Sequence, residues 1–296
     1  MIREGGCAHL IGMTDFLTTL SARAVIAITG DESRSFLQRV ITKGPEGLPK
    51  GGALFSALLT PQGKVLADFI VFDDGEGGLL IDAPFSEAEG LVKRFNLYRL
   101  RAKAEITLRD DLAVAAARGE GEAELKTVAL AAAPDPRNPA LGLRAIVPAG
   151  GPGDEADAYH AARIKAGVPE FGADYGAGEV FSTDVNHDRL GGLDYKKGCF
   201  VGQEVASRMH RKGGVRKRTL RLGFDIAGPE RGAPGRGAPV TAGETPLGEL
   251  TSSAGGNALA LIRTDRAAKA LEAGEAILAG GAPARLLDDP ATLSSA

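Results

Sequence analysis

The sequence predicts an α+β protein in which helices and strands mix over the first two thirds and a β-rich domain follows. Three patterns indicate this class. Alternating apolar strands meet at a tight turn over residues 60–63. Helical patterns follow strand patterns after residue 29 and again after residue 85. After Val215 the chain changes to short strands separated by loops rich in glycine and proline, which is typical of a small barrel or sandwich.

Length and composition are those of an ordinary soluble globular protein. The chain has 296 residues, more than one core usually supports, so we expect two or three domains. Its formal net charge is −3, with 25% charged and 44% apolar residues, which gives no global bias toward nucleic acid. No apolar run approaches the roughly 20 residues of a membrane span, and we expect no membrane partner.

The first elements follow a stretch with little pattern. We expect residues 1–13, which include Cys7, to form a disordered tail. A strand is predicted over residues 22–28, and Thr29-Gly30-Asp31-Glu32 is a capping box that would open a helix. The apolar residues that would share one face of this helix are Phe36, Leu37, Val40 and Ile41.

A hairpin comes next. Strands over residues 53–59 and 64–72 are joined by Thr60-Pro61-Gln62-Gly63, whose residue types suit a tight turn. Before residue 112 we further predict a strand at residues 79–82, a helix from a second capping box at residues 86–89 to about Tyr98, and a strand at residues 100–108.

The second half begins with more strands, predicted within residues 112–148. A helix over residues 154–166 is stopped by Gly167 and Pro169. Residues 170–214 are rich in glycine and aspartate and have little periodicity, and such long irregular segments are usually functional or disordered. Barrel strands are predicted at residues 219–224 and 258–263. The domains are therefore expected to span residues 14–214 and 215–296.

Cys199 is the strongest clue to function. It lies in Lys196-Lys197-Gly198-Cys199-Phe200-Val201-Gly202-Gln203-Glu204, between two lysines and a basic run that begins at Arg208. A positive field favours the thiolate, the form that attacks electrophiles and binds metals. The alternative is a small buried hydrophobe beside Phe200. Charge and spacing alone leave both interpretations open.

Asp68 is a second candidate site residue. In the second hairpin strand it falls on the same side as Leu66, Ile70 and Phe72, because side chains alternate along a strand. A carboxylate on an apolar face is costly unless it is paired or faces a cleft. It is therefore either a cleft-lining acid or a carboxylate satisfied by a backbone or arginine partner.

Residues 208–221 contain seven lysines and arginines and no acid. Such a stretch could hold phosphates or several carboxylates, although its usual meaning is a solvated surface. No aromatic residue lies between the basic ones, which disfavours RNA stacking, so we do not expect nucleic acid as a partner.

Several classes of site are absent from the sequence. Two cysteines and four histidines are too few and too scattered for a tetrahedral zinc site, so we predict no metal site of that kind. There is no GxxxxGK[ST] loop, no GxGxxG between a strand and a helix, and no GxSxG elbow. With neither a disulfide framework nor a signal peptide in view, we expect a reducing, cytoplasmic location.

The segment from Lys197 to Glu204 resembles the signature of the YgfZ-type proteins. These belong to the same superfamily as the aminomethyltransferase (T-protein) of the glycine cleavage system and include mitochondrial assembly factors for iron-sulfur enzymes. The similarity extends from about Leu20 to Arg263. Further matching segments, in family order, are residues 58–64, 98–103, 167–170, 192–193, 216–218 and 258–263.

The resemblance implies two ferredoxin-like α+β units and a C-terminal β-barrel, arranged as a ring around a central hole for a tetrahydrofolate derivative. It implies that Cys199 is the working thiolate, within a motif formed by Lys197, Gly198, Phe200, Gly202, Gln203 and Glu204. The residues expected to contact the folate, including any polyglutamate tail, are Asp68, Tyr98, Arg99, Arg101, Arg163, Arg208 and Arg218.

The implied role is folate-dependent support of iron-sulfur cluster assembly or repair in client enzymes, including radical enzymes that modify tRNA or form lipoate. One chain cannot supply four thiolates, so contact with a cluster requires a partner, and we expect assembly proteins and client enzymes as partners.

Two departures separate this chain from the aminomethyltransferases. Residues 63–68 keep one of the two acids of the corresponding segment, Asp68, and Lys165 stands where a glutamate holds the pterin. Lysine has no acceptor for the pterin N–H groups. We therefore favour an accessory protein without classical turnover. The alternatives are a folate-dependent aminomethyl or C1 transferase that uses Asp68, and an RNA-binding module.

Overall fold

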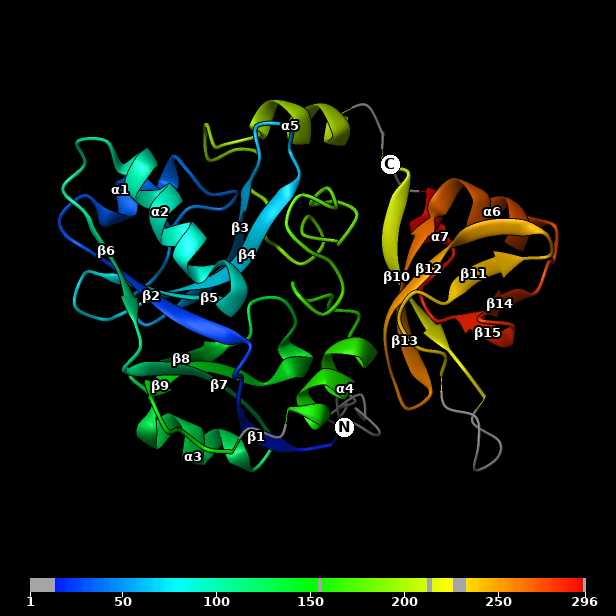
Figure 1. Ribbon diagram of the computed structural model, residues 1–296, viewed down its shortest axis with the longest axis horizontal. Helices are drawn as coiled ribbons and strands as arrows, with labels where there is room; N and C mark the ends of the chain where they lie inside the picture. The colour runs from blue at the N-terminus through cyan, green and yellow to red at the C-terminus, as the bar shows by residue number, and fades with distance from the viewer. Residues whose placement is uncertain (1–13, 154–155, 212–214, 226–232, 295–296) are drawn as a thin grey trace, which may run out of the picture.

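The computed structural model describes residues 14–153, 156–211, 215–225 and 233–294 of the chain. Two packed β-sheets with their helices form one side of the molecule, and a β-barrel forms the other (Figure 1). The predicted α+β class with a C-terminal barrel is confirmed. The tail predicted at residues 1–13 lies outside the described residues.

The first sheet is antiparallel, with the strand order β3-β4-β5-β2-β6. Helices α1 and α2 pack on one of its faces, where Phe95 lies edge-on to both Phe36 and Phe69. The elements are β2 (Arg23–Thr29), α1 (Ser33–Gln38), β3 (Ala53–Leu59), β4 (Val65–Asp73), β5 (Leu79–Pro84), α2 (Ala88–Arg99) and β6 (Glu105–Arg109).

The second sheet is also antiparallel and has the order β1-β7-β9-β8. One face shares a buried core with the first sheet, in which Val114 and Ile146 pack with Ile70 and Phe72. Helix α3 covers the other face through Leu125. The elements are β1 (Phe16–Thr19), β7 (Leu112–Arg118), α3 (Gly121–Val128), β8 (Ala131–Pro134), the short 3-10 helix η2 (Pro139–Leu141), β9 (Leu143–Pro148) and α4 (Asp157–Lys165).

In the described part of the chain, six strands close into a barrel in the order β10-β13-β12-β11-β14-β15. Helix α4 packs against its strands β12 and β13 and so links the barrel to the sheets. The elements are β10 (Lys217–Gly223), β11 (Pro239–Ala242), β12 (Thr245–Ala254), β13 (Asn257–Arg263), α6 (Thr264–Glu272), β14 (Ile277–Ala279), β15 (Ala282–Leu286) and α7 (Ala291–Ser294).

Both predicted capping boxes are wrong. Helix α1 has no side-chain cap, because the Glu32 carboxylate instead accepts a hydrogen bond from the backbone N–H of Lys103 at 2.7 Å. The short 3-10 helix η1 (Phe85–Glu87) precedes α2, and no side chain caps α2 either. The apolar residues predicted to share the face of α1 are all buried, although the last two follow the helix end: Phe36, Leu37, Val40 and Ile41.

The sequence patterns do not reveal α3, α6 or α5 (Gln203–Arg211). Each of these helices spans eight or nine residues, and an apolar period over about two turns is too short to stand out. The strand predicted at residues 100–108 begins only at Glu105. Leu100 has a φ of +52°, a conformation that ends the preceding helix and delays the strand.

A β-bulge changes the face on which Leu66 lies. The pairing of β3 with β4 shifts between Leu58 and Leu59, which leaves Leu66 as the extra residue. Leu66 therefore packs in the core beneath α1 and α2, whereas Ile70 and Phe72 pack toward the second sheet. The expectation that Asp68 shares a face with Leu66 is wrong, and a sequence pattern of strict alternation cannot show such a shift.

A chain of buried charges joins the two sheets. Asp82 of β5 accepts hydrogen bonds from Arg23 Nε of β2 at 2.6 Å and from Arg144 Nε of β9 at 2.7 Å. Arg144 Nη1 donates to the Tyr159 hydroxyl of α4 at 2.9 Å, and that hydroxyl donates to the Glu170 carboxylate. All five side chains are buried, so each charge depends on its partners.

Glu170 is the acid on which several of these arginines converge. Burial by itself would raise the pKa of Glu170, but the charges of Arg163, Arg137 and Arg144 outweigh it and hold the pKa far below its usual range. Arg137 Nη1 donates to this carboxylate at 3.2 Å. Glu170 is therefore ionised in the folded protein at neutral pH.

A second buried group joins the sheets to the barrel. Asp174 accepts hydrogen bonds from Arg163 Nη1 of α4 and from the Thr251 hydroxyl of β12, each at 2.6 Å. The Ser252 hydroxyl donates to the same carboxylate. Through Asp174, the segment after α4 therefore forms polar contacts with both the sheets and the barrel.

We predict that Asp82→Asn destabilises the fold by about 3–5 kcal/mol, because it leaves two buried guanidinium groups without their carboxylate. Urea unfolding followed by circular dichroism measures this change in the free energy of unfolding. Asp265→Asn is the matched control, since it removes an exposed ion pair with Arg263 and should leave stability nearly unchanged. Equal stability of the two variants would contradict the structural role of Asp82.

Candidate functional site

Cys199 is a free, exposed cysteine in the loop just before α5. In Figure 1 this helix lies at the top of the molecule, beside the turn between β3 and β4. The alternative of a buried cysteine is wrong, because the neighbouring Phe200 takes the buried position and is 6% exposed. The thiol is therefore accessible to a partner or a ligand.

Phe200 anchors the loop to the first half of the molecule. It packs in a buried cluster with Leu59 and Val65 of the hairpin and with Phe171. The ammonium of Lys197 lies 5.2 Å from the centre of the Phe200 ring, within the range of a cation–π contact. The backbone N–H of Val201 also donates to the carbonyl of Val40 at 3.3 Å. These contacts fix the backbone on both sides of the exposed thiol.

Glycines allow the cysteine loop to approach the hairpin turn. Gly202 has a φ of +79°, and a Cβ at this position would lie 2.5 Å from the Thr60 carbonyl oxygen. Gly63, in the turn, has a φ of +80°, and its Cβ would lie 3.0 Å from Val205 of α5. Two segments that are about 140 residues apart in the sequence are therefore in direct contact, and side chains at these positions would separate them.

Lys197 holds the loop on its other side. Its ammonium donates to the Gln38 carbonyl, and Gln38 Nε2 donates back to the Lys197 carbonyl at 3.4 Å. Burial lowers the pKa of Lys197, while the charges of Asp194, Glu46 and Cys199 act in the opposite direction. This lysine is thus a structural contact of the motif as well as a positive charge near the thiol.

Several exposed cations and one exposed acid lie close to the cysteine in the chain. Lys196 precedes the thiol, and Arg208, His210 and Arg211 are exposed on the last turns of α5. The His210 ring stacks on Tyr195, with 4.3 Å between ring centres. Partial burial raises the pKa of Tyr195 to about 12, so this phenol is neutral at physiological pH. Of the other motif residues, Gln203 is half-buried and Glu204 is exposed at the start of α5.

Asp68 lies inside the molecule, which confirms the alternative of a carboxylate satisfied by an arginine, although its tyrosine and histidine partners were not predicted. It accepts a hydrogen bond from the Tyr175 hydroxyl, and His187 Nε2 and Arg23 Nη1 lie 3.7 and 3.8 Å from its oxygens. Burial would raise the pKa of Asp68, but the contacts with His187, Arg23 and Tyr175 prevail and lower it. Asp68 is therefore a satisfied, ionised carboxylate at 2% exposure.

Two of the arginines predicted to bind folate, one on α4 and one on β10, form ion pairs inside the protein. Arg163 is 2% exposed and pairs with Asp174. Arg218 is 5% exposed and donates to both oxygens of Asp188, at 2.9 and 2.8 Å. Both guanidinium groups already have protein carboxylates as partners, so neither is free to hold the carboxylates of a ligand.

The remaining predicted folate contacts do not complete one pocket. Tyr98 and Arg99 lie on the last turn of α2, where Arg99 Nη1 donates to the Ala104 carbonyl at 2.7 Å. Arg101 is exposed in the turn between α2 and β6, and Arg208 is exposed on α5. Among the described residues, no contact joins these side chains to Asp68. These predicted residues therefore do not form a single site, and we derive no chemistry through a folate.

The basic run is likewise divided between interior and surface. Arg218 is buried, and Arg221 Nε donates to Asp288 at 2.8 Å. Arg208, Arg211, Arg216 and Lys217 are exposed. The usual interpretation of such a stretch, a solvated surface, therefore holds for only part of its described residues, because Arg218 of β10 is buried.

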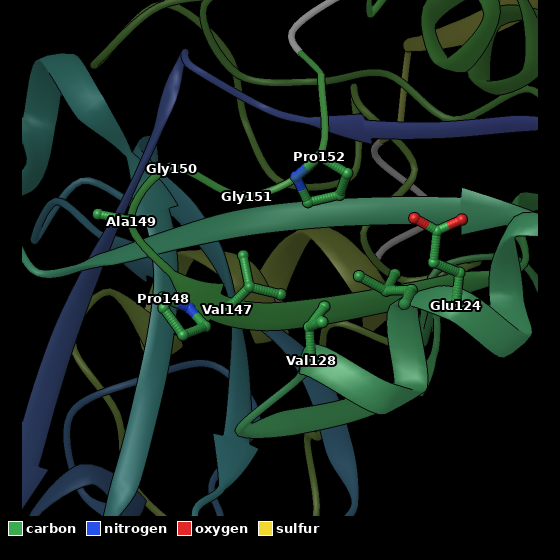
Figure 2. Close-up of a pocket in the computed structure, with 9 residues that line it drawn as sticks. Glu124, Val128, Val147, Pro148, Ala149, Gly150, Gly151 and Pro152 are labelled. Carbon is green, nitrogen blue, oxygen red and sulfur yellow. The ribbon is translucent and has the colours of Figure 1, made fainter.

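Cavities of about 370 and 450 Å³ lie elsewhere on the sheets. Figure 2 shows the first, in which Val128 and Glu124 of α3 face Val147 of β9 and the turn at residues 149–152. Neither cavity is lined by Cys199 or Asp68. The candidate site is therefore centred on an exposed thiol.

Sequence reasoning missed the buried partners of Asp68. Tyr175 carried no signal, because it lies in the segment without periodicity. His187 is 1% exposed and packs edge-on against Phe55, at 4.8 Å between ring centres. A histidine between Asn186 and Asp188 suggests a surface loop, and only the fold shows that it is buried.

Comparison with known proteins shows the family to which the chain belongs. The human iron-sulfur cluster assembly factor IBA57, a mitochondrial protein, is 30% identical over 276 residues, which cover 83% of this chain and 77% of the human protein. The chain belongs to the IBA57 family. The IBA57 homologue of Neurospora crassa is 32% identical over 249 residues, and the aligned part covers 75% of this chain but only 57% of the fungal protein.

The barrel and the whole fold have matches of their own. Residues 216–290 match the family model of the CAF17 C-terminal beta-barrel domain. The crystal structure of the glycine cleavage system aminomethyltransferase T from Bartonella henselae has a TM-score of 0.70 and 17% sequence identity, and it covers 93% of this chain and 85% of that chain. The fold and superfamily predicted from the sequence are confirmed.

The expected cytoplasmic location is wrong. The relatives, including the mouse and human proteins, are named as mitochondrial. Cysteine usage separates oxidising from reducing surroundings, and it cannot distinguish one reducing compartment from another. In the described ranges, no helix is both long and apolar enough to cross a membrane.

We predict that Gly202→Ala destabilises the protein more than Gly198→Ala. Both positions have positive φ, which costs alanine about 1–2 kcal/mol. Only the Gly202 variant meets the Thr60 carbonyl, which should add about 1 kcal/mol or more, since a Cβ at Gly198 meets nothing within 4 Å. Urea unfolding of the two variants measures the difference. Equal losses would mean that the loop does not rest on the hairpin turn.

Proposed function

We propose that the protein acts in iron-sulfur cluster assembly and that Cys199 supplies one thiolate ligand to a cluster shared with a partner protein. Membership of the IBA57 family supports a role in iron-sulfur cluster assembly. The exposure of the free thiol supports the choice of Cys199 as the ligand, because a shared ligand must be accessible to the partner protein. The observation that carries the proposal is this exposed thiol on a loop whose two sides are anchored.

The composition of the site supports a shared cluster over a resident one. Within the described residues, no group of three or more histidine, cysteine, aspartate or glutamate side chains is placed to hold a metal. Iron-sulfur clusters are usually held by four protein ligands. The other ligands therefore come from the partner, which we take to be an assembly protein or a client enzyme.

Charge near the thiol suits an anionic cargo. A cluster bound by thiolates carries negative charge, and the exposed cations Lys196, Arg208 and Arg211 outnumber the exposed acid Glu204 in the segment around the thiol. The charges also steer an acidic partner toward the site, an effect that weakens as the salt concentration rises. The cluster in this account is cargo, and the chain provides a ligand, a rigid loop and a favourable field.

The first test is complementation of cells that lack their native factor. We expect wild-type protein to restore the activity of iron-sulfur enzymes and Cys199→Ser to restore little or none, because a serine hydroxyl stays protonated and does not replace a thiolate ligand. Cys7→Ser is the matched control and should rescue like the wild type. Immunoblotting for equal protein levels separates loss of function from loss of protein.

Full rescue by Cys199→Ser would contradict the role of the thiol, whatever the family. Failure of the wild type together with rescue by the native factor would instead contradict the assembly role. The two outcomes therefore distinguish an error about the role of Cys199 from an error about the role of the protein in cluster assembly.

Tetrahydrofolate binding stays a prediction, as does the prediction that the client enzymes modify tRNA or form lipoate.

We expect calorimetric titration with tetrahydrofolate to give saturable heat. A polyglutamylated form should bind more tightly than the monoglutamate, and Arg208→Ala should reduce that difference, because Arg208 is an exposed cation available to the tail carboxylates. Absence of heat at millimolar tetrahydrofolate would contradict folate binding.

A C1 transferase that uses Asp68 is the weaker candidate. Tyr175 covers this carboxylate with a hydrogen bond, and the side chain is buried. A substrate amine would have to displace that contact before it reached the acid.

A further inference from the structure

Strand β6 forms one edge of the five-stranded sheet. It pairs with β2 on one side, and in the described residues no other strand pairs with it. Figure 1 shows β6 at the outer margin of the molecule, with no element beyond it. An edge of this kind carries a row of backbone N–H and C=O groups that can accept another strand.

Apolar side chains are exposed along and near this edge. Leu108 of β6 is 43% exposed, and the nearby Phe85 and Leu100 are 68% and 84% exposed. Phe85 and Leu108 line the same cavity, of about 450 Å³. Large apolar side chains that cluster on a surface commonly mark an interaction site.

The sequence of β6 is complementary to itself. The strand is Glu105-Ile106-Thr107-Leu108-Arg109. If two copies pair antiparallel about a two-fold axis at Thr107, Glu105 of each copy lies opposite Arg109 of the other. On the other face of the same pair, Ile106 lies opposite Leu108. Each of these favourable cross-strand pairs occurs twice.

The same register extends beyond the strand end. Lys103 of one copy would lie opposite Asp111 of the other, another pair of opposite charges. Within one chain, Arg109 already donates to both oxygens of Asp111, at 2.7 and 2.6 Å. Pairing would therefore place Lys103 and Glu105 of one copy opposite Asp111 and Arg109 of the other, so that each charge meets one of opposite sign.

From this pattern we infer that two copies of the protein associate through β6, which joins their sheets into one continuous ten-stranded sheet. The interaction surface consists of the β6 backbone with the side chains of Glu105, Leu108 and Arg109, while Ile106 is buried in the core of its own copy.

A second copy fits this edge better than an unrelated strand. Charged residues on an edge usually protect it, because they meet unmatched or like charges on an arbitrary partner. Here the two charges become complementary only when the partner carries the same pattern in the antiparallel register. A shift by two residues would bring Glu105 opposite Thr107 or Thr107 opposite Arg109 and lose both ion pairs.

Association at β6 leaves the cysteine loop free. Cys199 lies beside the β3–β4 turn, and β3 is the opposite edge of the same sheet. Four inter-strand spacings separate β3 from β6, which amounts to about 19 Å. Each dimer thus presents two accessible Cys199 thiols, and the inference is independent of the proposed function.

The test is the molar mass in solution, measured by light scattering and by sedimentation velocity from about 1 to 100 μM. We expect the wild type to approach twice the mass of the 30.5 kDa chain as its concentration rises. Glu105→Arg and Arg109→Glu should each remain monomeric, with association weakened at least about tenfold, because each places like charges opposite one another twice.

Mixing these two variants should restore a dimer, since both contacts between position 105 of one copy and position 109 of the other then join opposite charges. The double swap within one chain should also dimerise. Glu272→Arg is the matched control: it reverses one exposed charge on α6 of the barrel, away from β6, and should still dimerise. Circular dichroism confirms that each variant is folded.

A wild type that stays monomeric at about 100 μM would overturn the inference. So would dimers that persist in both single charge variants, because their interface would then lie elsewhere. Restored mass in the mixture of the two variants is the result that only the proposed register explains.

Discussion

The fold depends on carboxylates that are buried between arginines. Asp82 holds one arginine from each sheet, and Asp174 holds Arg163 together with two hydroxyl groups of the barrel. These pairs occupy the centre of the molecule, where an unpaired charge would cost several kcal/mol. The relative position of the two sheets and the barrel therefore depends on a few polar contacts as well as on apolar packing.

Charged residues that the sequence suggested for a ligand site are used inside the fold. The aminomethyltransferase T structure shares the fold at 17% identity. In the present chain, Asp68, Arg163 and Arg218 are each paired with partners inside the protein and do not line an open pocket. The chemistry that remains accessible lies at the surface, at the thiol of Cys199. A protein that lends a ligand to a cluster needs such an exposed group and a backbone that holds it in place.

Much of the fold could be predicted because its signals are local. The hairpin of β3 and β4 follows from apolar alternation and the residues of its turn, and the barrel follows from short strands between glycine and proline loops. Short helices such as α3 and α5 escaped, since two turns carry too little periodicity. The first capping box failed because the Glu32 carboxylate bonds Lys103, 71 residues away in the chain.

The sequence by itself determined the class of fold and the superfamily, and it singled out Cys199 as the candidate functional residue, because strand patterns, turn residues and a long motif around Cys199 are properties of consecutive residues. Only the tertiary structure decided that this cysteine is exposed, that Gly202 rests on the hairpin turn, and that the predicted folate arginines Arg163 and Arg218 are paired internally. Burial and charge pairing join residues that are distant in the chain. Their energies depend on which groups the fold brings together, and no local pattern records that.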